Sequence, residues 1–397
     1  MLHVYIIYFS RALISLVTVP VLVARLDDYW GLVAVALSTW QFSLVVVEFG
    51  FGISGVTAAM SVRDRPNLLG LLLKNTLLLQ FFLALPCILF IISVSLTVHL
   101  SYVSIACLIA AVVLQGLTPI WMLKAMENLR AVAVAELAAK LLLFFFIYRT
   151  VSSPNDIDLL FVFYAASSLI PFTVALFASS KYCVFERGVV HAAFTLENIF
   201  KTSLPLLGVR VAGMTISVGG SLLFGIMGMV SLAGQYAILE RVVTAARTIF
   251  LPVFEVLLPR LLALGYMSVS EVRLRKMVLY CMLCAGVVIG FILIFFRELI
   301  ILYFNGSATL NECLLFLSFV PIVVILLNHV GLNHLVANNF GIKYFQALSL
   351  GAVMYICLLF IITDFPVNVL MHASVAYVTA LAVSLFACLK LKSSYVQ

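Results

Sequence analysis

Residues 203–221 read SLPLLGVRVAGMTISVGGS, a stretch that is long and apolar enough to cross a bilayer yet carries Arg210 near its middle. A charged side chain at that depth costs ~2.5–3.5 kcal/mol on membrane-insertion scales. The cost falls where the charge faces a water-filled cavity or a permanent anion. At helical spacing Ser203, Arg210, Ser217 and Ser221 fall near one face. This one-sided polar stripe predicts a helix that lines a hydrated cavity.

The first apolar stretch, residues 3–25, has the same arrangement, with Tyr8, Arg11, Ser15 and Thr18 near one helical face. It is too long for the core of a signal peptide and lacks an obvious small-residue cleavage site, so we expect a retained helix. Arg11 and Arg210 therefore stand at matching places in the two halves of the chain. Their positions predict a cavity to which both halves contribute.

Composition places the chain among all-α integral membrane proteins. Hydrophobic residues make up 65% of the sequence and charged residues 10%, whereas soluble domains carry about 25% charged residues. A spanning helix needs about 20 mostly apolar residues, and the 397 residues hold about 12 such segments. No stretch is polar enough for a soluble domain. The net charge of +7 therefore reflects membrane topology, and we expect no nucleic-acid partner.

The basic residues predict the topology of these segments. With the amino terminus in the cytoplasm, the opposite face of the membrane holds only Arg25, Arg149 and Arg297, and five basic residues lie within spans. The other 15 of the 23 lysines and arginines fall on cytoplasmic connections, helix ends and the tail. This bias follows the positive-inside rule and predicts both termini in the cytoplasm. We expect spans near residues 3–25, 30–60, 68–97, 101–123, 131–150, 158–180, 202–228, 231–262, 275–304, 311–336, 343–363 and 366–389.

The longest polar connection divides the chain into two similar halves. Residues 1–180 would form an N-terminal six-helix lobe, residues 181–201 a cytoplasmic connecting loop, and residues 202–397 a C-terminal six-helix lobe. Parallel repeats with a site between them are a common plan among transporters. We therefore expect two lobes around a central cavity.

Arg11 and Arg210 are the strongest candidates for contact with a substrate. A guanidinium group can make bidentate contacts with phosphate. The alternative is an ion pair between helices, because buried charges often pair internally. Arg241 and Arg247 are further candidates for the cavity.

Two acidic residues are candidates for ion coupling. A carboxylate such as Glu48 could carry a coupling proton in a cavity, or it could pair with Arg11 or another neighbour. Glu240 and Arg247 are seven residues apart and share a helical face, so they either line the cavity or pair with another helix. Arg241 lies about 100° from Glu240 on an ideal helix.

The sequence contains no motif of a soluble enzyme, a nucleotide-driven pump or a metal site. It has no Walker loop, no H-E-x-x-H and no G-x-S-x-G. His329 and His334 are five residues apart, a spacing that does not share a face of an α-helix, so we expect no metal there. We predict a protein without cofactor or enzymatic activity.

Five short motifs resemble a known pattern of membrane transporters. Glu48-Phe-Gly-Phe-Gly-Ile-Ser54 is similar to the family pattern D-[FY]-G-[FL]-x-x-S, and Pro119-Ile-Trp121 with Glu127 is similar to P-x-W-x-x-x-G-x-E. The remaining three are Arg25-Leu-Asp-Asp-Tyr-Trp-Gly-Leu32, Gly234-Gln-Tyr-Ala237, and Pro252 with Pro259-Arg260. Together they resemble the polysaccharide-exporter branch of the MATE-like (MOP) superfamily, and most of all its Wzx-type O-antigen flippases.

The resemblance covers residues 1–265 clearly, and the last third matches in length and hydropathy. The chain departs from the family pattern at Asp27-Asp28, which replace the usual Leu-Gly, and at Ala125, where glycine is usual. Glu48 stands for the common aspartate and keeps its charge.

The resemblance implies twelve helices in two lobes around a V-shaped hydrated cavity, in a bacterial inner membrane. It implies an undecaprenyl-diphosphate-linked oligosaccharide as substrate, moved from the cytoplasmic to the periplasmic leaflet by alternating access. Membrane lipids, a polysaccharide polymerase and a chain-length regulator would be the partners. The alternatives are an ion-coupled drug or cation antiporter of the same superfamily, a membrane-embedded polysaccharide polymerase or ligase, and a lipid-binding scaffold. Basic residues in the cavity argue against the antiporter, and the short external loops argue against the enzymes.

Overall fold

The computed structural model describes residues 2–186, 191–251, 253–254, 269–336, 340–363 and 368–396. All regular structure in these residues is helical. The elements are α1 (Leu2–Leu26), η1 (Asp27–Tyr29), α2 (Trp30–Glu48), α3 (Ser54–Ser61), α4 (Pro66–Thr97), α5 (Tyr102–Gly116), α6 (Ile120–Ala125), α7 (Arg130–Thr150), η2 (Pro154–Asp156), α8 (Ile157–Ser180), η3 (Ala192–Phe194), α9 (Leu196–Ile226), α10 (Val230–Thr248), α12 (Val269–Phe295), α13 (Arg297–Tyr303), α14 (Thr309–Leu317), α15 (Val320–Val330), η4 (Gly331–Val336), α16 (Gly341–Thr363) and α17 (Val369–Val396).

The helices account for the spans predicted from the sequence. Ten helical runs among the described residues are long and apolar enough to cross a membrane. The first run, His3–Glu48, contains both α1 and α2, and α10, with its three charged residues, lies outside the ten. Counting α1 and α2 separately and adding α10 gives the twelve expected spans. The chain is thus a multi-pass membrane protein.

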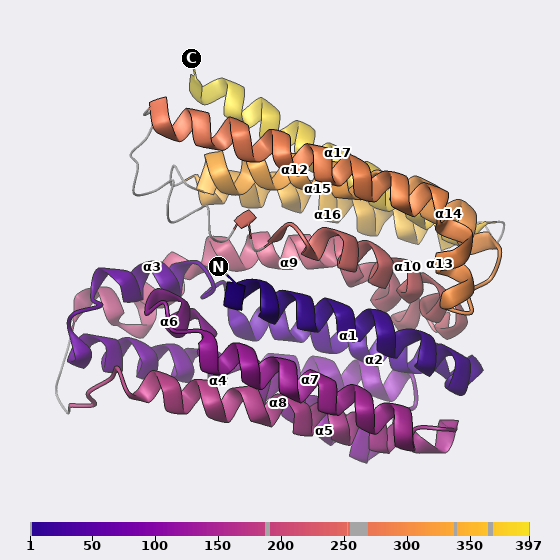
Figure 1. Ribbon diagram of the computed structural model, residues 1–397, viewed down its shortest axis with the longest axis horizontal. Helices are drawn as coiled ribbons and strands as arrows, with labels where there is room; N and C mark the ends of the chain where they lie inside the picture. Colours follow the sequence, from indigo (N-terminus) through magenta and orange to yellow (C-terminus); the bar gives the residue numbers. More distant parts are fainter. Residues whose placement is uncertain are drawn as a thin grey trace.

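The helices form two groups with α9 and α10 between them. In Figure 1 helices α1 to α8 fill the lower part of the molecule and α12 to α17 the upper part. Helix α9 packs against α2 of the first group and α16 of the second, while α10 packs against both α1 and α2. The first two helices after the connection therefore form the contact between the two groups.

The predicted span 30–60 is broken directly after Glu48. Phe49 adopts a left-handed conformation with φ 47°, and its backbone N–H caps the helix by donating to the carbonyls of Val45 and Val46. Gly50 follows with φ +79°, a conformation that glycine adopts without strain. A Cβ at Gly50 would also lie 2.9 Å from the Cβ of Leu206 in α9. The Phe-Gly pair therefore ends α2 and leaves Glu48 as its last residue.

The predicted span 101–123 is broken at residues 117–119. Pro119 precedes α6 and removes a backbone donor, so the chain turns between α5 and α6. The amide Nε2 of Gln80 in α4 donates to the carbonyl of Gly116 at 2.9 Å, which satisfies one of the acceptors at the end of α5. The break gives α6 its own direction beside the turn that follows α2.

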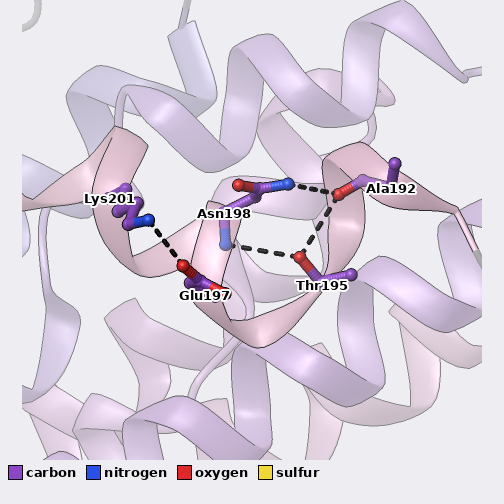
Figure 2. A network of polar contacts seen from close by, with 5 residues as sticks. All are labelled: Ala192, Thr195, Glu197, Asn198 and Lys201. Carbon is purple, nitrogen blue, oxygen red and sulfur yellow. Dashed lines mark hydrogen bonds and ion pairs between the residues drawn. The ribbon is translucent and has the colours of Figure 1, made fainter.

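Helix α9 begins at Leu196, six residues before the predicted boundary of 202. Thr195 caps it by accepting from the backbone N–H of Asn198, whose side-chain amide in turn donates to the Ala192 carbonyl (Figure 2). The ion pair between Lys201 and Glu197 lies on the next turn. These short-range bonds favour helix well before the apolar stretch begins.

The start of α9 is attached to the N-terminal group of helices. The side-chain amide of Asn75 in α4 donates to the carbonyl of Phe194 at 2.7 Å. Phe200 stacks on Phe49 with ring centroids 5.0 Å apart, and the hydroxyls of Ser54 and Ser203 lie 2.8 Å apart. The start of α9 is therefore anchored to α3, α4 and the turn after α2.

Near the other end of the bundle, the motif at residues 25–32 contacts the motif at residues 234–237. The indole Nε1 of Trp30 donates to the carbonyl of Gly234 at 2.9 Å. Gly31 packs against the backbone of α10, where a Cβ would lie 2.1 Å from the carbonyl oxygen of Val230. The two motifs thus bring α2 and α10 together through backbone contact that only glycine permits.

Candidate functional site

A cavity of about 120 Å³ lies among the helices of the N-terminal group and α9. This is less than the ~300–1,000 Å³ of typical ligand pockets, so it has room for a small polar group rather than a sugar chain. Helix α9 contributes one lining residue, Arg210. The lining residues are Val4, Ile7, Tyr8, Glu48, Phe51, Gly52, Gln80, Gly116, Thr118, Ile120, Trp121, Lys124 and Arg210.

The motifs around Glu48 and Trp121 form two walls of this cavity. Glu48, Phe51 and Gly52 come from the turn after α2, and Ile120 and Trp121 come from α6. The rings of Phe51 and Trp121 pack with centroids 6.4 Å apart. The helix breaks described above are what place these residues together, because continuous helices would carry the chain past this region.

Arg210 and Glu48 form an ion pair in the cavity. Nη1 of Arg210 donates to Oε2 of Glu48 at 2.7 Å, and their side chains are 33% and 27% exposed. Glu48 is the last residue of α2, where the helix dipole disfavours negative charge, so the guanidinium compensates for its position. Of the two roles considered for Glu48, the structure shows pairing, with Arg210 as the partner.

The pairing leaves Arg210 in a polar cavity rather than a dry core. One third of its side chain is exposed, and it shares the cavity with Gln80, Thr118 and Lys124. A neighbouring glycine, Gly213, has no atom within 4 Å of the position of a Cβ. The polar stripe predicted for this stretch therefore faces open space over part of its length.

Lys124 is a cavity residue that the sequence analysis did not identify. From its position near the end of a predicted span, it counted only as one of the basic residues on the cytoplasmic side. In the structure it lines the cavity from α6, with Nζ 5.6 Å from the ring centroid of Tyr8. The Pro119-Ile-Trp121 motif, which precedes it by three residues, was the available signal.

Arg11 belongs to α1 by its backbone, but its side chain lies outside the part of the chain that the structure describes. It follows Ile7 and Tyr8, which line the cavity, by four and three residues along the helix. Its expected contact with a substrate stays a prediction.

Glu240 is almost fully buried outside the cavity, with 5% of its surface exposed. Its carboxylate accepts hydrogen bonds from the backbone N–H and the hydroxyl of Ser221, at 3.2 and 2.5 Å. The hydroxyl of Ser38 in α2 lies 2.7 Å from that of Ser221. Since Ser221 donates to Glu240, Ser38 donates to Ser221. The carboxylate therefore ends a chain of hydrogen bonds that links α2, α9 and α10.

Arg241 and Arg247 do not line the cavity described above. Arg241 is buried, and the amide oxygen of Gln41, oriented toward it, accepts from both terminal nitrogens of the guanidinium. Arg247 is half-buried near the end of α10 and interacts electrostatically with Tyr377 of α17. The structure thus brings Arg210 and Glu48 together and places Glu240, Arg241 and Arg247 elsewhere.

The region around His329 and His334 differs from the expectation of an α-helix. Residues Gly331–Val336 form a π-helix, η4, and its wider turn brings the two imidazole rings to a centroid distance of 5.1 Å. The spacing of an ideal α-helix therefore does not describe how these two side chains lie. Nη1 of Arg275 lies 2.7 Å from Nδ1 of His334, so this ring nitrogen of His334 is already in a hydrogen bond with the guanidinium. Among the described residues, no group of three or more metal-binding side chains is found.

Comparison with known proteins supports the fold and the resemblance. No family model matches the chain. The protein named "Putative O-antigen transporter" of Escherichia coli (strain K12) is 20% identical over 364 residues, which cover 89% of this chain and 87% of that protein.

Solved structures of MATE transporters have the same fold. The structure "MATE in complex with MaL6" superposes with a TM-score of 0.65 at 13% identity, over 98% of this chain and 96% of that one. An inward-facing multidrug resistance MATE family transporter of the MOP superfamily superposes with a TM-score of 0.60 at 11% identity, over 96% and 98%. The resemblance to the MOP superfamily is thereby confirmed, as is the all-helical fold. These relatives are transporters rather than enzymes, in agreement with the sequence analysis.

Proposed function

We propose that this transporter moves a lipid-linked oligosaccharide, carried on undecaprenyl diphosphate, from the cytoplasmic to the periplasmic leaflet of a bacterial inner membrane. One observation carries the proposal: Arg210 of α9 lines a cavity among the helices of the N-terminal group, where it is paired with Glu48 at the end of α2. An arginine in that position suits a phosphate group, which guanidinium binds through two parallel hydrogen bonds.

A cavity inside the protein would let such a substrate avoid the hydrocarbon core of the membrane. A glycan cannot cross hydrocarbon unaided, because its hydroxyls would lose their hydrogen bonds to water. A cavity that opens to one side at a time removes this barrier, while the polyprenyl tail stays in the surrounding lipid. The cavity here is too small for a sugar chain, so in this conformation it fits only the phosphate part of the substrate.

Two contacts would change as the two lobes rock. Near one end, Trp30 and Gly31 meet α10, and near the other, α9 is anchored to α2, α3 and α4. Opening the molecule at either end requires one of these contacts to separate. The chain of hydrogen bonds from Ser38 to Glu240 crosses the same interface.

The remaining expectations belong to the same proposal. Both termini lie in the cytoplasm, following the distribution of basic residues. An ion gradient drives net transport through Glu48 or Glu240, and Arg11 assists Arg210. Arg241 and Arg247 serve the cavity in a conformation other than this one. A polysaccharide polymerase and a chain-length regulator act on the exported product.

The rival function is efflux of drugs or cations, which the names of several structural neighbours indicate for those proteins. A cation-binding cavity needs an excess of negative charge. Among the described residues that line this one, the charged groups are Glu48, Lys124 and Arg210, an excess of one positive charge. This balance favours an anionic substrate.

Replacement of Arg210 with Ala tests the proposal. In a cell that depends on this protein for surface glycan, we expect Arg210→Ala to abolish export while the protein still inserts into the membrane at normal abundance. Arg149→Ala, at the far end of α7 from the cavity, is the matched control and should leave export unchanged. Normal export by Arg210→Ala, or transport of cationic dyes by the wild-type protein without any effect on glycan, would contradict the proposed function.

A further inference from the structure

We propose that Lys124 is a substrate-binding residue that, together with Arg210, holds the diphosphate group in the cavity. This inference rests on the proposed function and adds to it a specific phosphate contact in the N-terminal lobe. From its place near the end of a predicted span, Lys124 was expected only to help set the membrane topology. The proposal gives it a second role, in binding the substrate.

The position of Lys124 follows from the break between α5 and α6. Pro119 starts a new helical segment, and Gln80 of α4 holds the preceding turn by its bond to the Gly116 carbonyl. Three residues after Trp121, Lys124 then lies against Tyr8 of α1, with Nζ 5.6 Å from the ring centroid. The side chain is thereby directed along the wall of the cavity rather than into the surrounding water.

The charges of the cavity require a second cation for a diphosphate. Arg210 is already paired with Glu48 at 2.7 Å, so much of its charge is balanced within the protein. A lysine ammonium is a compact charge with three rotatable donors, suited to a phosphate oxygen. Lys124 brings a second positive charge to the cavity lining from α6, whereas Arg210 comes from α9.

Two neutral groups in the cavity wall have no hydrogen-bond partner in the described part of the chain. Trp121 is 4% exposed, and its indole N–H, which can only donate, has no hydrogen-bond partner there. Gln80 is 1% exposed and uses its amide N–H, while its amide oxygen has no partner in the same set of residues. Buried polar groups are normally satisfied, so an unpaired donor in this wall points to a ligand oxygen or a bound water.

Other lysines on the same side of the predicted topology show what a purely topological charge looks like. Lys181 is exposed and lies over the ring of Phe177, with Nζ 4.8 Å from its centroid. It follows the end of α8 and does not line the cavity. Lys181 therefore serves as a matched control for the loss of a lysine charge.

The test measures binding by the full-length protein in detergent, without transport. The probes are farnesyl diphosphate, farnesol and inorganic pyrophosphate, which separate the lipid-linked from the free anion. We expect Lys124→Gln to weaken binding of farnesyl diphosphate by about tenfold or more, as for loss of a charge-assisted hydrogen bond. Lys124→Arg should keep most of the wild-type affinity for farnesyl diphosphate, and Lys181→Gln should bind it as the wild-type protein does. None of these proteins should bind farnesol specifically.

A second measurement uses only the wild-type protein and does not depend on the folding of a variant. Amine labelling followed by mass spectrometry should show that farnesyl diphosphate protects Lys124 and leaves Lys181 reactive. Affinity of Lys124→Gln within twofold of wild type, or labelling of Lys124 unaffected by the ligand, would overturn the assignment. Tight binding of pyrophosphate alone, with no gain from the farnesyl chain, would also overturn it by showing a site for free anions. If the wild-type protein binds no polyprenyl diphosphate, the proposed function itself fails.

Discussion

The ion pair between Glu48 and Arg210 predicts a measurable coupling between helices α2 and α9. We consider Glu48→Gln and Arg210→Gln, singly and together, with the free energy of unfolding in detergent as the readout. The amide of glutamine keeps the size of the glutamate side chain while removing its charge. The structure specifies both the magnitude and the asymmetry of the expected effects.

The magnitude follows from the distance and the exposure of the pair. Two unit charges 4 Å apart attract by about 4 kcal/mol at an effective dielectric constant near 20. The side chains here are 33% and 27% exposed, and fully exposed pairs contribute only ~0.2–1 kcal/mol. We therefore expect a coupling energy of about 1–2 kcal/mol, between these two limits.

The asymmetry follows from the helix dipole. Arg210→Gln leaves the Glu48 carboxylate unpaired at the C-terminus of α2, where the dipole opposes it by ~0.3–1 kcal/mol. Glu48→Gln removes that unfavourable charge and leaves Arg210 in a polar cavity that water can enter. Arg210→Gln should therefore destabilise the protein more than Glu48→Gln does.

An exposed ion pair in the same helix is the matched control. Lys201 and Glu197 are four residues apart in α9, with side chains 66% and 74% exposed. The corresponding double-mutant cycle should give a coupling energy of ~0.5 kcal/mol or less. Additive effects of Glu48→Gln and Arg210→Gln, or a coupling no larger than that of the control pair, would refute the reasoning about this cavity.

Two further predictions concern the contacts among α2, α9 and α10. If Glu240 carries the coupling ion, proteoliposomes with Glu240→Gln should flip substrate at the same rate with and without a pH gradient. Ser38→Ala should slow the transport cycle but keep its dependence on the gradient. A normal gradient response in Glu240→Gln would exclude that role for Glu240, and Glu48→Gln would then be measured in the same assay. Gly31→Ala would place a Cβ 2.1 Å from the Val230 carbonyl oxygen, so we expect a loss of ~1–3 kcal/mol in the free energy of unfolding. Gly213→Ala, with no atom within 4 Å of the new Cβ, should change that free energy little. Equal effects of the two alanines would mean that α2 and α10 do not meet closely at Gly31.

Much of the fold follows directly from the sequence. The lipid environment requires every span to satisfy its own backbone hydrogen bonds, so apolar segments of sufficient length must be helices. This rule and the distribution of basic residues together predicted the twelve spans, and the motifs around Glu48 and Trp121 indicated the family resemblance. The helix breaks within two spans were missed, because the Phe-Gly turn after Glu48 and the turn before Pro119 interrupt runs that stay apolar throughout.

The site was only partly accessible from sequence, because its geometry depends on contacts between distant segments. The stretch around Arg210 carries its charge at membrane depth, and the energetic cost of that placement was enough to mark the residue as a cavity candidate. Nothing in the spacing of residues along the chain identified Glu48 as its partner, 162 residues away.

The same reason explains Lys124 and Glu240. Whether a lysine near the end of a span faces water or a cavity depends on the direction of α6, which the preceding turn and the bond from Gln80 decide. Whether a buried glutamate lines a cavity or ends a hydrogen-bond chain depends on which helix packs beside it, and here that helix is α9. The sequence by itself determined that charges are placed inside the membrane, since hydrophobicity is a local property of the chain. Only the tertiary structure decided which charges meet, because pairing is a property of distances between helices.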